Sequence, residues 1–428
     1  MIDASRRGAL LRLFALAAAT ATPPRLLAAQ SSAKVVIVGG GFAGGACATW
    51  LSRLSPKLRV TVIEPAKRMP TGFFCNTVIG GLNPMAFITR QPGHLRERGI
   101  GVLHAAVRGI EPSTRQITLE DGTRLQADAL VVAPGISMRW GDIEGYDESQ
   151  AVDNPPAWPG TEDDLRRVAA RLRALPKGGT LAMVTPPAPY RCPPGPYERA
   201  SLFAHVLKEI NPRAKILIFD AKDDFSKQSL FFEAWARHYP GMISWKGRQD
   251  GGRVQRVWPH GKGLTLASGE TVAADWVHVI PAQQAAAVAR DAGLCADGQW
   301  IRVRPTDFSV PGLQRVYALG DAVDMQPMPK SAFAANNQGR QCAHAIVADL
   351  EQRPHQASWL ANTCYSMVAP DTAFSVSSLY QVDGKALRVA NAHSQLTPLG
   401  VRPAVYARER QEAEALYRHL CHESFGAF

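Results

Sequence analysis

The chain has 428 residues, enough for two or three domains that each bury a core of their own. Apolar residues make up 46% of it and charged residues 20%, as in a soluble globular protein, and no later stretch of eighteen apolar residues suggests a membrane-spanning helix. The formal charge of +11 is spread without a basic run or a nucleic-acid recognition motif, so it indicates either a solubilising surface or steering toward an acidic partner.

The N-terminal residues differ from the rest of the chain. Ser5-Arg-Arg-Gly-Ala-Leu-Leu11 opens an alanine-rich apolar run that continues to Ala21, and prolines and the small pair Ala28-Ala29 follow. This pattern predicts a twin-arginine export signal over residues 1–30 and a periplasmic protein. The periplasm permits disulfides, but the number of cysteines is odd, so at least one stays unpaired or has another role. The seven are Cys47, Cys75, Cys192, Cys295, Cys342, Cys364 and Cys421.

A buried strand and a glycine-rich turn begin the fold. Lys34-Val-Val-Ile-Val38 is a continuous apolar run, typical of a strand that is covered on both faces of a parallel sheet. Gly39, Gly41 and Gly44 follow in the GxGxxG spacing. The first glycine permits the tight turn, the second lets backbone approach a pyrophosphate, and the third lets the next helix pack on the strand.

The elements after this turn complete a nucleotide-binding unit. Residues 46–54 have helical character, and residues 60–63 form a second apolar strand. Glu64 ends that strand, where an acidic side chain can accept hydrogen bonds from ribose hydroxyls. Because the strands, the helix and the acid accompany the glycines, the region predicts a dinucleotide site.

Two further segments favour FAD over NAD at this site. Residues 129–135 form an apolar strand that ends in Gly135 and resembles the strand through which flavoprotein reductases re-enter their first domain. Arg315-Val-Tyr-Ala-Leu-Gly-Asp-Ala322 resembles the second FAD fingerprint of those reductases. There an aspartate, here Asp321 after Gly320, hydrogen-bonds the ribityl chain, and the next helix directs its N-terminus at the phosphates.

The middle of the chain has lost a second nucleotide site. Residues 178–185 predict the strand that precedes a second glycine-rich turn in two-dinucleotide flavoproteins, but a proline-rich segment over 186–196 follows. Prolines fix φ and lack the N–H groups of a phosphate loop, so the flavin is not expected to exchange hydride with a nicotinamide. Cys192 is held rigidly among these prolines, as a redox disulfide beside a flavin requires. The sequence alone does not identify its partner cysteine.

The predicted architecture is α/β, with two Rossmann-like three-layer domains of the dinucleotide-binding type and a C-terminal α+β interface domain. The FAD-binding domain is expected in two pieces, 34–148 and 270–350, around a degenerate NAD-binding-like domain at 149–269. Residues 351–428 form the C-terminal domain, which is expected to pack near the flavin and to supply Cys364.

Four segments resemble one family. They closely resemble parts of the flavoprotein subunit of flavocytochrome c sulfide dehydrogenase, in the FAD-dependent pyridine nucleotide-disulfide oxidoreductase superfamily. The resemblance runs from about Lys34 to the C-terminus, and its Cys-Pro-Pro-Gly-Pro motif is specific. The segments are Arg191-Cys-Pro-Pro-Gly-Pro-Tyr-Glu-Arg-Ala-Ser201, Phe225-Ser-Lys-Gln-Ser229, Pro327-Met-Pro-Lys-Ser331 and Asn362-Thr-Cys-Tyr-Ser366.

The resemblance implies a reaction and its catalytic residues. In the family, the cysteines that match Cys192 and Cys364 form a redox-active disulfide beside the flavin, and hydrosulfide attacks it by thiol–disulfide exchange. The resulting thiolate reduces FAD, and electrons pass one at a time to haem in a separate cytochrome c subunit. Glu198 is placed by its motif to act as acid or base. This chain contains no Cys-x-x-Cys-His motif, so the haem must belong to that partner.

The resemblance also bears on how the cofactor is held. Lys330 is expected to bind it. The family commonly attaches FAD to a cysteine shortly after the Glu-Pro at the end of the second strand, but here that position falls on Gly72, three residues before Cys75. Cys75 either reaches the flavin through a loop adjustment or leaves FAD without a covalent link. Cys47 and Cys342 fit small apolar positions in helix cores.

Two other functions remain compatible with the motifs. A sulfide:quinone reductase would need an apolar quinone channel and an amphipathic membrane-docking helix, and the charges over residues 407–418 argue against that helix. A non-enzymatic flavoprotein that binds or activates a sulfur-oxidising partner is kept open by the altered region at Gly72. No metal site is predicted.

Overall fold

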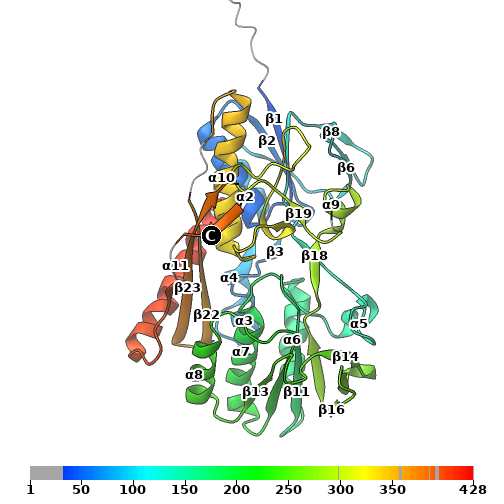
Figure 1. The fold of residues 1–428 in the computed structure, drawn as a ribbon, viewed down its shortest axis with the longest axis vertical. Helices are drawn as coiled ribbons and strands as arrows, with labels where there is room; N and C mark the ends of the chain where they lie inside the picture. Colours follow the sequence, from blue (N-terminus) through cyan, green and yellow to red (C-terminus); the bar gives the residue numbers. More distant parts are fainter. Residues whose placement is uncertain (1–31, 297, 356–358, 385, 391–394, 428) are drawn as a thin grey trace, which may run out of the picture.

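The computed structural model describes residues 32–296, 298–355, 359–384, 386–390 and 395–427. The predicted export signal at residues 1–30 lies outside these ranges. Two α/β domains are stacked end to end, and the C-terminal strands and helix lie along one side of both (Figure 1). The predicted fold class is confirmed, because both domains contain parallel sheets and the C-terminal domain is built on an antiparallel sheet.

The first domain is organised around a five-stranded parallel sheet in the order β20-β9-β1-β2-β5. The apolar run that begins the fold forms β1 at its centre, paired in register with β2 on one side and β9 on the other. The carboxyl end of β1 therefore lies at the middle of the sheet edge, where doubly wound sheets bind their ligands. The strands are β1 (Lys34–Val38), β2 (Arg59–Ile63), β5 (Gly101–Leu103), β9 (Ala129–Val132) and β20 (Val316–Ala318).

Helices α2 and α10 pack against each other beside this sheet. Helix α2 begins at Phe42, earlier than expected, because Gly44 lies inside its first turn. Cys47 and Cys342 are fully buried where the two helices meet. The remaining elements, with 3-10 helices written η, are α2 (Phe42–Leu54), β3 (Met69–Pro70), α3 (Cys75–Ile79), α4 (Met85–Ile88), β4 (Thr89–Arg90), η1 (Pro92–Arg98), β6 (Val107–Glu111), β7 (Gln116–Leu119), β8 (Arg124–Gln126), α9 (Ala287–Asp291), β19 (Ile301–Arg302), η3 (Gly320–Ala322), β21 (Val323–Asp324) and α10 (Ala332–Leu350).

The central domain has a four-stranded parallel sheet in the order β13-β12-β11-β17, with a small antiparallel sheet, β14-β15-β16, beside it. Its elements are α5 (Glu148–Asp153), α6 (Glu162–Arg173), β11 (Thr180–Thr185), α7 (Gly195–Ile210), β12 (Lys215–Asp220), α8 (Gln228–His238), β13 (Ile243–Lys246), β14 (Val254–Val257), η2 (Pro259–Gly261), β15 (Gly263–Leu266), β16 (Thr271–Ala273) and β17 (Trp276–Val279).

The expected return to the first domain at residue 270 was placed too early. β17 is buried along its whole length and pairs with β11, so it completes the central sheet. The chain returns only at β18 (Gln283–Ala285), which pairs antiparallel with the outgoing strand β10 (Ile136–Met138). These two short strands connect the domains.

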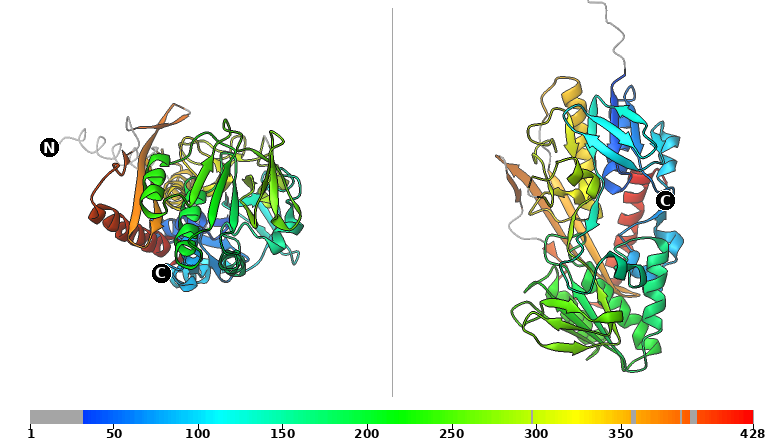
Figure 2. Two further views of the ribbon diagram at one scale, coloured as in Figure 1. Left: turned by 90° about the horizontal axis from the view of Figure 1, so that it is seen from below. Right: turned by 90° about the vertical axis from the view of Figure 1, so that its right-hand side faces the viewer.

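The C-terminal domain joins the other two. Strand β22 (Leu360–Ala369) packs against α10 of the first domain and α7 of the central domain. It pairs with β23 (Thr372–Asp383), and the two long strands run beside both domains (Figure 2). β24 (Ala386–Val389) and β25 (Gln395–Leu396) extend this sheet, and α11 (Pro403–Phe425) packs on β23.

The end of α11 is seated against the first domain. Ser424 Oγ donates to the Phe42 carbonyl oxygen at 3.0 Å and accepts from Asn336 Nδ2 at 3.0 Å, so it connects α2 and α10. The rings of Phe42 and Phe425 meet edge to face with centroids 5.2 Å apart. In the part of the chain that the structure describes, no helix is both long enough and apolar enough to cross a membrane.

This seating depends on Gly45 and predicts a stability effect. A Cβ at residue 45 would lie 1.8 Å from the Ser424 carbonyl oxygen, and backbone cannot yield as a side-chain tip can. We expect Gly45→Ala to displace the end of α11 and to lower the free energy of unfolding by about 2 kcal/mol. Thermal denaturation of matched samples measures the change. Gly109→Ala is the control, because a Cβ there meets no atom within 4 Å; equal loss in both variants would contradict the prediction.

Candidate active site

One long cavity joins the carboxyl edge of the first sheet to α7 and β22. It encloses about 1170 Å³ of space, part of which is open to solvent. Segments from all three domains line it, which explains why its residues are scattered along the sequence. The predicted site residues that line it are Gly39, Gly41, Glu64, Gly135, Cys192, Glu198, Gly320, Asp321 and Cys364.

The glycine turn forms a cradle at one end of the cavity. Gly39 has φ +102°, which other residues rarely adopt, and a Cβ there would lie 2.2 Å from the Ala133 carbonyl oxygen. A Cβ on Gly41 would meet nothing within 4 Å, so the backbone faces open space where a pyrophosphate can approach. Gly44 does not line the cavity. Its missing side chain lets α2 pack against the turn, since a Cβ there would lie 2.0 Å from the Gly39 carbonyl oxygen.

Glu64 is held rigidly at the edge of this cradle. Its Oε2 accepts a hydrogen bond from the Gly40 N–H at 2.9 Å, and its Oε1 accepts from the Ala66 N–H at 3.0 Å. Each carboxylate oxygen has a second lone pair, so both can still accept from ribose hydroxyls. The geometry fits the predicted role of this residue.

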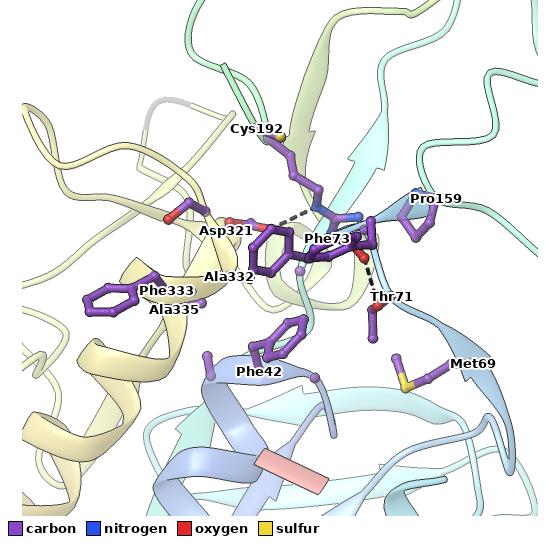
Figure 3. A pocket seen from close by; sticks show the side chains of 18 of the residues that line it. Phe42, Met69, Thr71, Phe73, Pro159, Cys192, Asp321, Ala332, Phe333 and Ala335 are labelled. Atoms are coloured by element: carbon purple, nitrogen blue, oxygen red, sulfur yellow. Dashed lines mark hydrogen bonds and ion pairs between the residues drawn. The ribbon is translucent and has the colours of Figure 1, made fainter. Parts of the chain in front are cut away.

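Asp321 presents an unused acceptor to the cavity. Arg191 Nε donates to its Oδ2 at 2.8 Å (Figure 3). Its Oδ1 is buried and, among the described residues, has no hydrogen-bond partner. A buried carboxylate oxygen without a donor is unfavourable, and a hydroxyl of a bound ribityl chain supplies one. With the cradle and the N-terminus of α10 at the same cavity, this orphaned atom shows that the residues fit FAD.

The structure does not bring Cys75 or Lys330 into this cavity. Cys75 begins α3 and lies 3.9 Å from an Arg199 NH2 group that donates to its Sγ, and burial raises the pKa of its thiol. Gly72, Phe73 and Phe74 line the cavity instead. The expectation that Cys75 binds the cofactor is therefore not supported, because the turn before α3 directs its thiol away.

Lys330 holds the loop beneath the cavity. Its Nζ donates to the Asp321 carbonyl oxygen at 3.0 Å and lies 3.6 Å from the Trp300 ring centroid. Burial lowers the pKa of this amine to about 8. Its carbonyl oxygen accepts from the Cys192 N–H at 2.7 Å. Lys330 thus lines a small adjoining cavity and positions the two residues that line the main one.

Cys192 and Cys364 meet at the other end of the cavity. Cys192 has a left-handed backbone, with φ 58°, in the proline-rich turn before α7, and Cys364 lies in the middle of β22. Each thiol shifts the pKa of the other, so the two side chains lie close together. A Cβ at Gly195 would lie 2.9 Å from the Cys192 sulfur and 2.5 Å from the Trp158 ring, so the glycine of the proline-rich motif makes room for the thiol. The sequence alone did not identify the partner of Cys192. The fold places Cys364 beside it, which is the cysteine that the family resemblance implied.

The pKa values of the two thiols are shifted in opposite directions. The hydrogen bond that Cys192 donates to Cys364 lowers the pKa of Cys364 to about 7, and the nearby positive charge of Lys227 acts in the same direction. The same hydrogen bond, with burial, holds the pKa of Cys192 well above its usual value. When the reduced pair loses a proton, the thiolate therefore forms on Cys364 and the remaining proton stays on Cys192.

Glu198 is buried beside the thiols and is held by two donors. Its Oε1 accepts from the Met367 N–H at 2.8 Å, and its Oε2 accepts from Asn76 Nδ2 at 2.7 Å. Burial raises the pKa of this carboxyl. A carboxyl with a raised pKa that lines the cavity is suited to exchange a proton with a bound substrate.

Asn76 and Arg199 support Glu198, and sequence reasoning missed both. Arg199 Nε donates to Asn76 Oδ1 at 2.9 Å, which fixes the amide that binds Glu198. The guanidinium is fully buried, donates to the Ala157 carbonyl oxygen at 2.6 Å and lies over the Trp158 ring. Arg199 follows Glu198 directly in the Cys-Pro-Pro-Gly-Pro segment, which was the only signal for its importance.

Side chains fill the nucleotide position of the central domain. Asp220 ends β12 as Glu64 ends β2, but Tyr197 OH, Trp245 Nε1 and Lys222 Nζ donate to its carboxylate. Lys222 also donates to the Pro186 carbonyl oxygen at 2.7 Å, across the turn where a pyrophosphate would lie. The acid that would bind a ribose is thus occupied, and the proline turn offers no cradle.

Three family models match the chain, each over a different part. Residues 33–158 match the pyridine nucleotide-disulphide oxidoreductase model. Residues 166–281 match the central region of the sulfide dehydrogenase (flavocytochrome c) flavoprotein chain. Residues 356–425 match the flavin-binding model of flavocytochrome c sulphide dehydrogenase. The matches follow the order of the three domains.

Solved structures share this fold at low sequence identity. The sulfide:quinone oxidoreductase of the hyperthermophilic bacterium Aquifex aeolicus has a TM-score of 0.75 and 18% identity, over 92% of each chain. A chain of the Tetrahymena thermophila mitochondrial ATP synthase has a TM-score of 0.69 and 15% identity, over 93% of this chain and 97% of that one. An NAD-dependent persulfide reductase of A. fulgidus has a TM-score of 0.61 and 17% identity, over 82% of this chain and 64% of that one. At these identities the likeness shows the fold alone.

The orphaned oxygen of Asp321 predicts a large loss of flavin affinity on substitution. Asp321→Ala removes the acceptor and leaves Arg191 without its carboxylate, so we expect FAD to bind about 10- to 100-fold more weakly. Fluorescence titration of the deflavinated protein with FAD measures this. Asp324→Ala is the control, because that carboxylate lies at the exposed end of β21 and, among the described residues, accepts a hydrogen bond only from the nearby Gln326 N–H. Equal affinity in the Asp321 variant and the wild type would contradict the assignment.

Proposed function

We propose, on the premise that this chain belongs to the family of flavocytochrome c sulfide dehydrogenase flavoproteins, that it oxidises hydrosulfide at Cys192 and Cys364 and delivers the electrons to a c-type cytochrome subunit. The observation that carries this proposal is the position of the two thiols. They meet at one end of a cavity whose other end holds a dinucleotide cradle and the unused acceptor of Asp321.

The chemistry of the cysteines starts from their oxidised form, a disulfide. Hydrosulfide attacks one sulfur, the S–S bond breaks, and the products are a persulfide on one cysteine and a thiolate on the other. Atoms and charge balance in this step, because the negative charge of hydrosulfide appears on the released thiolate. Glu198 lines the cavity beside both sulfurs and, with its raised pKa, accepts or returns the proton of the attacking species.

FAD supplies the chemistry that couples a two-electron thiol reaction to a one-electron haem acceptor. The residues that would hold it are the glycine turn, Glu64, Asp321 and the N-terminus of α10. No thiol of the described residues at this end of the cavity faces it, since Gly72 occupies the family's attachment position and Cys75 faces Arg199. We therefore propose that FAD is bound without a covalent link.

The class of electron acceptor follows from the inability of the central domain to bind a nicotinamide. Because the proline turn and the occupied Asp220 leave no nicotinamide site, the electrons must leave through another protein or a small acceptor. Members of the family are subunits of flavocytochromes, which contain haem as well as flavin. This sequence holds no haem-attachment motif, which supports a separate cytochrome subunit that carries the haem. The paired arginines at the N-terminus support export by the twin-arginine route to the periplasm, where such a cytochrome would be met.

Anaerobic titration of the purified protein with sulfide tests the function. We expect sulfide to bleach the flavin absorbance of the wild type, and to leave it unchanged when either Cys192→Ser or Cys364→Ser removes the exchangeable pair. Cys295→Ser is the matched control, because that cysteine does not line the cavity. A wild-type flavin that sulfide does not bleach would overturn the proposal and favour a binding role. Faster reoxidation by a quinone than by a c-type cytochrome would overturn the proposed acceptor.

Acid precipitation tests how FAD is held. We expect precipitation to release all of the flavin into the supernatant from the wild type and from Cys75→Ser alike, because the Cys75 thiol is directed at Arg199. The absorbance of supernatant and pellet measures the distribution. Flavin that stays in the wild-type pellet but is released from the Cys75→Ser variant would show a covalent link and disprove this part of the proposal.

A further inference from the structure

Lys227 is a buried cation that the proposed reaction leaves without a role. It lies in the Phe225-Ser-Lys-Gln-Ser229 segment and precedes α8 with a left-handed backbone, φ 66°. Its side chain is buried, and Nζ donates to the Cys364 carbonyl oxygen at 2.7 Å and lies 5.7 Å from the Phe374 ring centroid. Within the described part of the chain, no carboxylate lies close enough to Nζ to form an ion pair with it.

A buried ammonium group is costly unless an anion compensates it. One hydrogen bond to a carbonyl oxygen and contact with a ring face compensate it only in part. The groups that face Lys227 are Cys364 on β22, Glu198 on α7, Cys192 in the proline-rich turn and Glu409 on α11. Burial lowers the pKa of the Lys227 amine, and among the neighbouring groups that oppose this change Cys364 acts most strongly, so its thiolate is the anion that best compensates the buried charge.

We propose that Lys227 is a positioning residue for sulfide oxidation, whose charge stabilises the thiolate that forms when the Cys192–Cys364 disulfide opens. This inference rests on the function proposed above and adds the group that sets the pH range of the reaction. The charge lowers the pKa of Cys364, while the negative charge of Glu198 raises it. With Lys227 present, Cys364 of the opened pair therefore stays deprotonated to a lower pH than it would without that charge.

A purely structural role predicts something different. If Lys227 only ties the start of α8 to β22 through the Cys364 carbonyl oxygen, any donor of similar length serves. Lys227→Gln offers an N–H donor without a charge, whereas Lys227→Arg keeps both the donor and the charge. The two variants thus separate the charge from the hydrogen bond.

The test measures thiolate formation directly. The protein is reduced with a dithiol, freed of reductant without oxygen and alkylated with iodoacetamide from about pH 5 to 9, and the rate at Cys364 is followed by mass spectrometry. In the wild type the rate is expected to rise through about pH 7, the pKa of that thiol. In Lys227→Gln the midpoint is expected to move up by about one pH unit or more, and in Lys227→Arg to stay near the wild-type value.

Sulfide titration of the same variants gives the functional readout. Bleaching of the flavin by sulfide in Lys227→Gln is expected to slow about fivefold at pH 7, because a one-unit rise from a pKa of about 7 lowers the thiolate fraction from about one half to about one tenth, and to recover as the pH rises. Lys215→Gln is the matched control. It removes an exposed lysine of the same domain whose Nζ also donates to a carbonyl oxygen, that of Gly241 at 2.7 Å.

The outcomes are distinguishable. An unchanged alkylation midpoint in Lys227→Gln, with a wild type that sulfide still bleaches, would overturn the role of Lys227 and leave the enzyme function intact. A midpoint that rises by about one pH unit in Lys227→Arg would also overturn it, because that variant keeps the charge. This comparison needs only the arginine variant and the wild type, so it answers the question if the glutamine variant fails to fold. A wild type that sulfide does not bleach would instead sink the proposed function, whatever the alkylation profiles show.

Discussion

The close approach of the Cys192 and Cys364 thiols is the constraint on which the rest of the site depends. It joins a turn of the central domain to a strand of the C-terminal domain, and each side is fixed by its own contacts. The Cys192 N–H donates to the Lys330 carbonyl oxygen, and the Cys364 carbonyl oxygen accepts from Lys227. Because Lys330 also holds the backbone of Asp321, the position of the sulfurs is tied to the position of the cofactor cradle.

The proline-rich turn after β11 accounts for two features at once. It removes the second nucleotide site, and it holds Cys192. The turn after β11 would cradle a phosphate if glycines let its backbone approach the ligand, but here prolines shape it and give Cys192 its left-handed conformation. The space beside it is filled by Lys222, which bridges Asp220 and the Pro186 carbonyl oxygen. The same residues that exclude a nicotinamide therefore hold the cysteine that, in the proposed reaction, takes its place as the electron donor.

Sequence reasoning could reach those parts of the fold that short segments determine. The apolar run from Lys34, the glycine turn and the acid at Glu64 were predictable because a few adjacent residues dictate them. The end of the central domain was not, because β17 belongs there only through its pairing with β11. The direction of the Cys75 thiol and the support that Asn76 gives to Glu198 depend on side chains brought together from distant segments, which no local pattern records.

The charges at the sulfur end of the cavity explain why an anion suits it. Arg199 and Lys227 are buried cations, while Glu198 is a buried carboxyl on which both charges act, and burial raises its pKa. Whenever Glu198 holds a proton, the site carries an excess of positive charge in a poorly solvated setting, where Coulomb attraction is strong. In the proposed reaction, hydrosulfide and the released thiolate are both small anions, so the same arrangement favours the entering nucleophile and the leaving sulfur. In the proposed reaction, the cost of burying two cations is thus offset by the negative charge that enters with the substrate and remains on the protein after the sulfur–sulfur bond has broken.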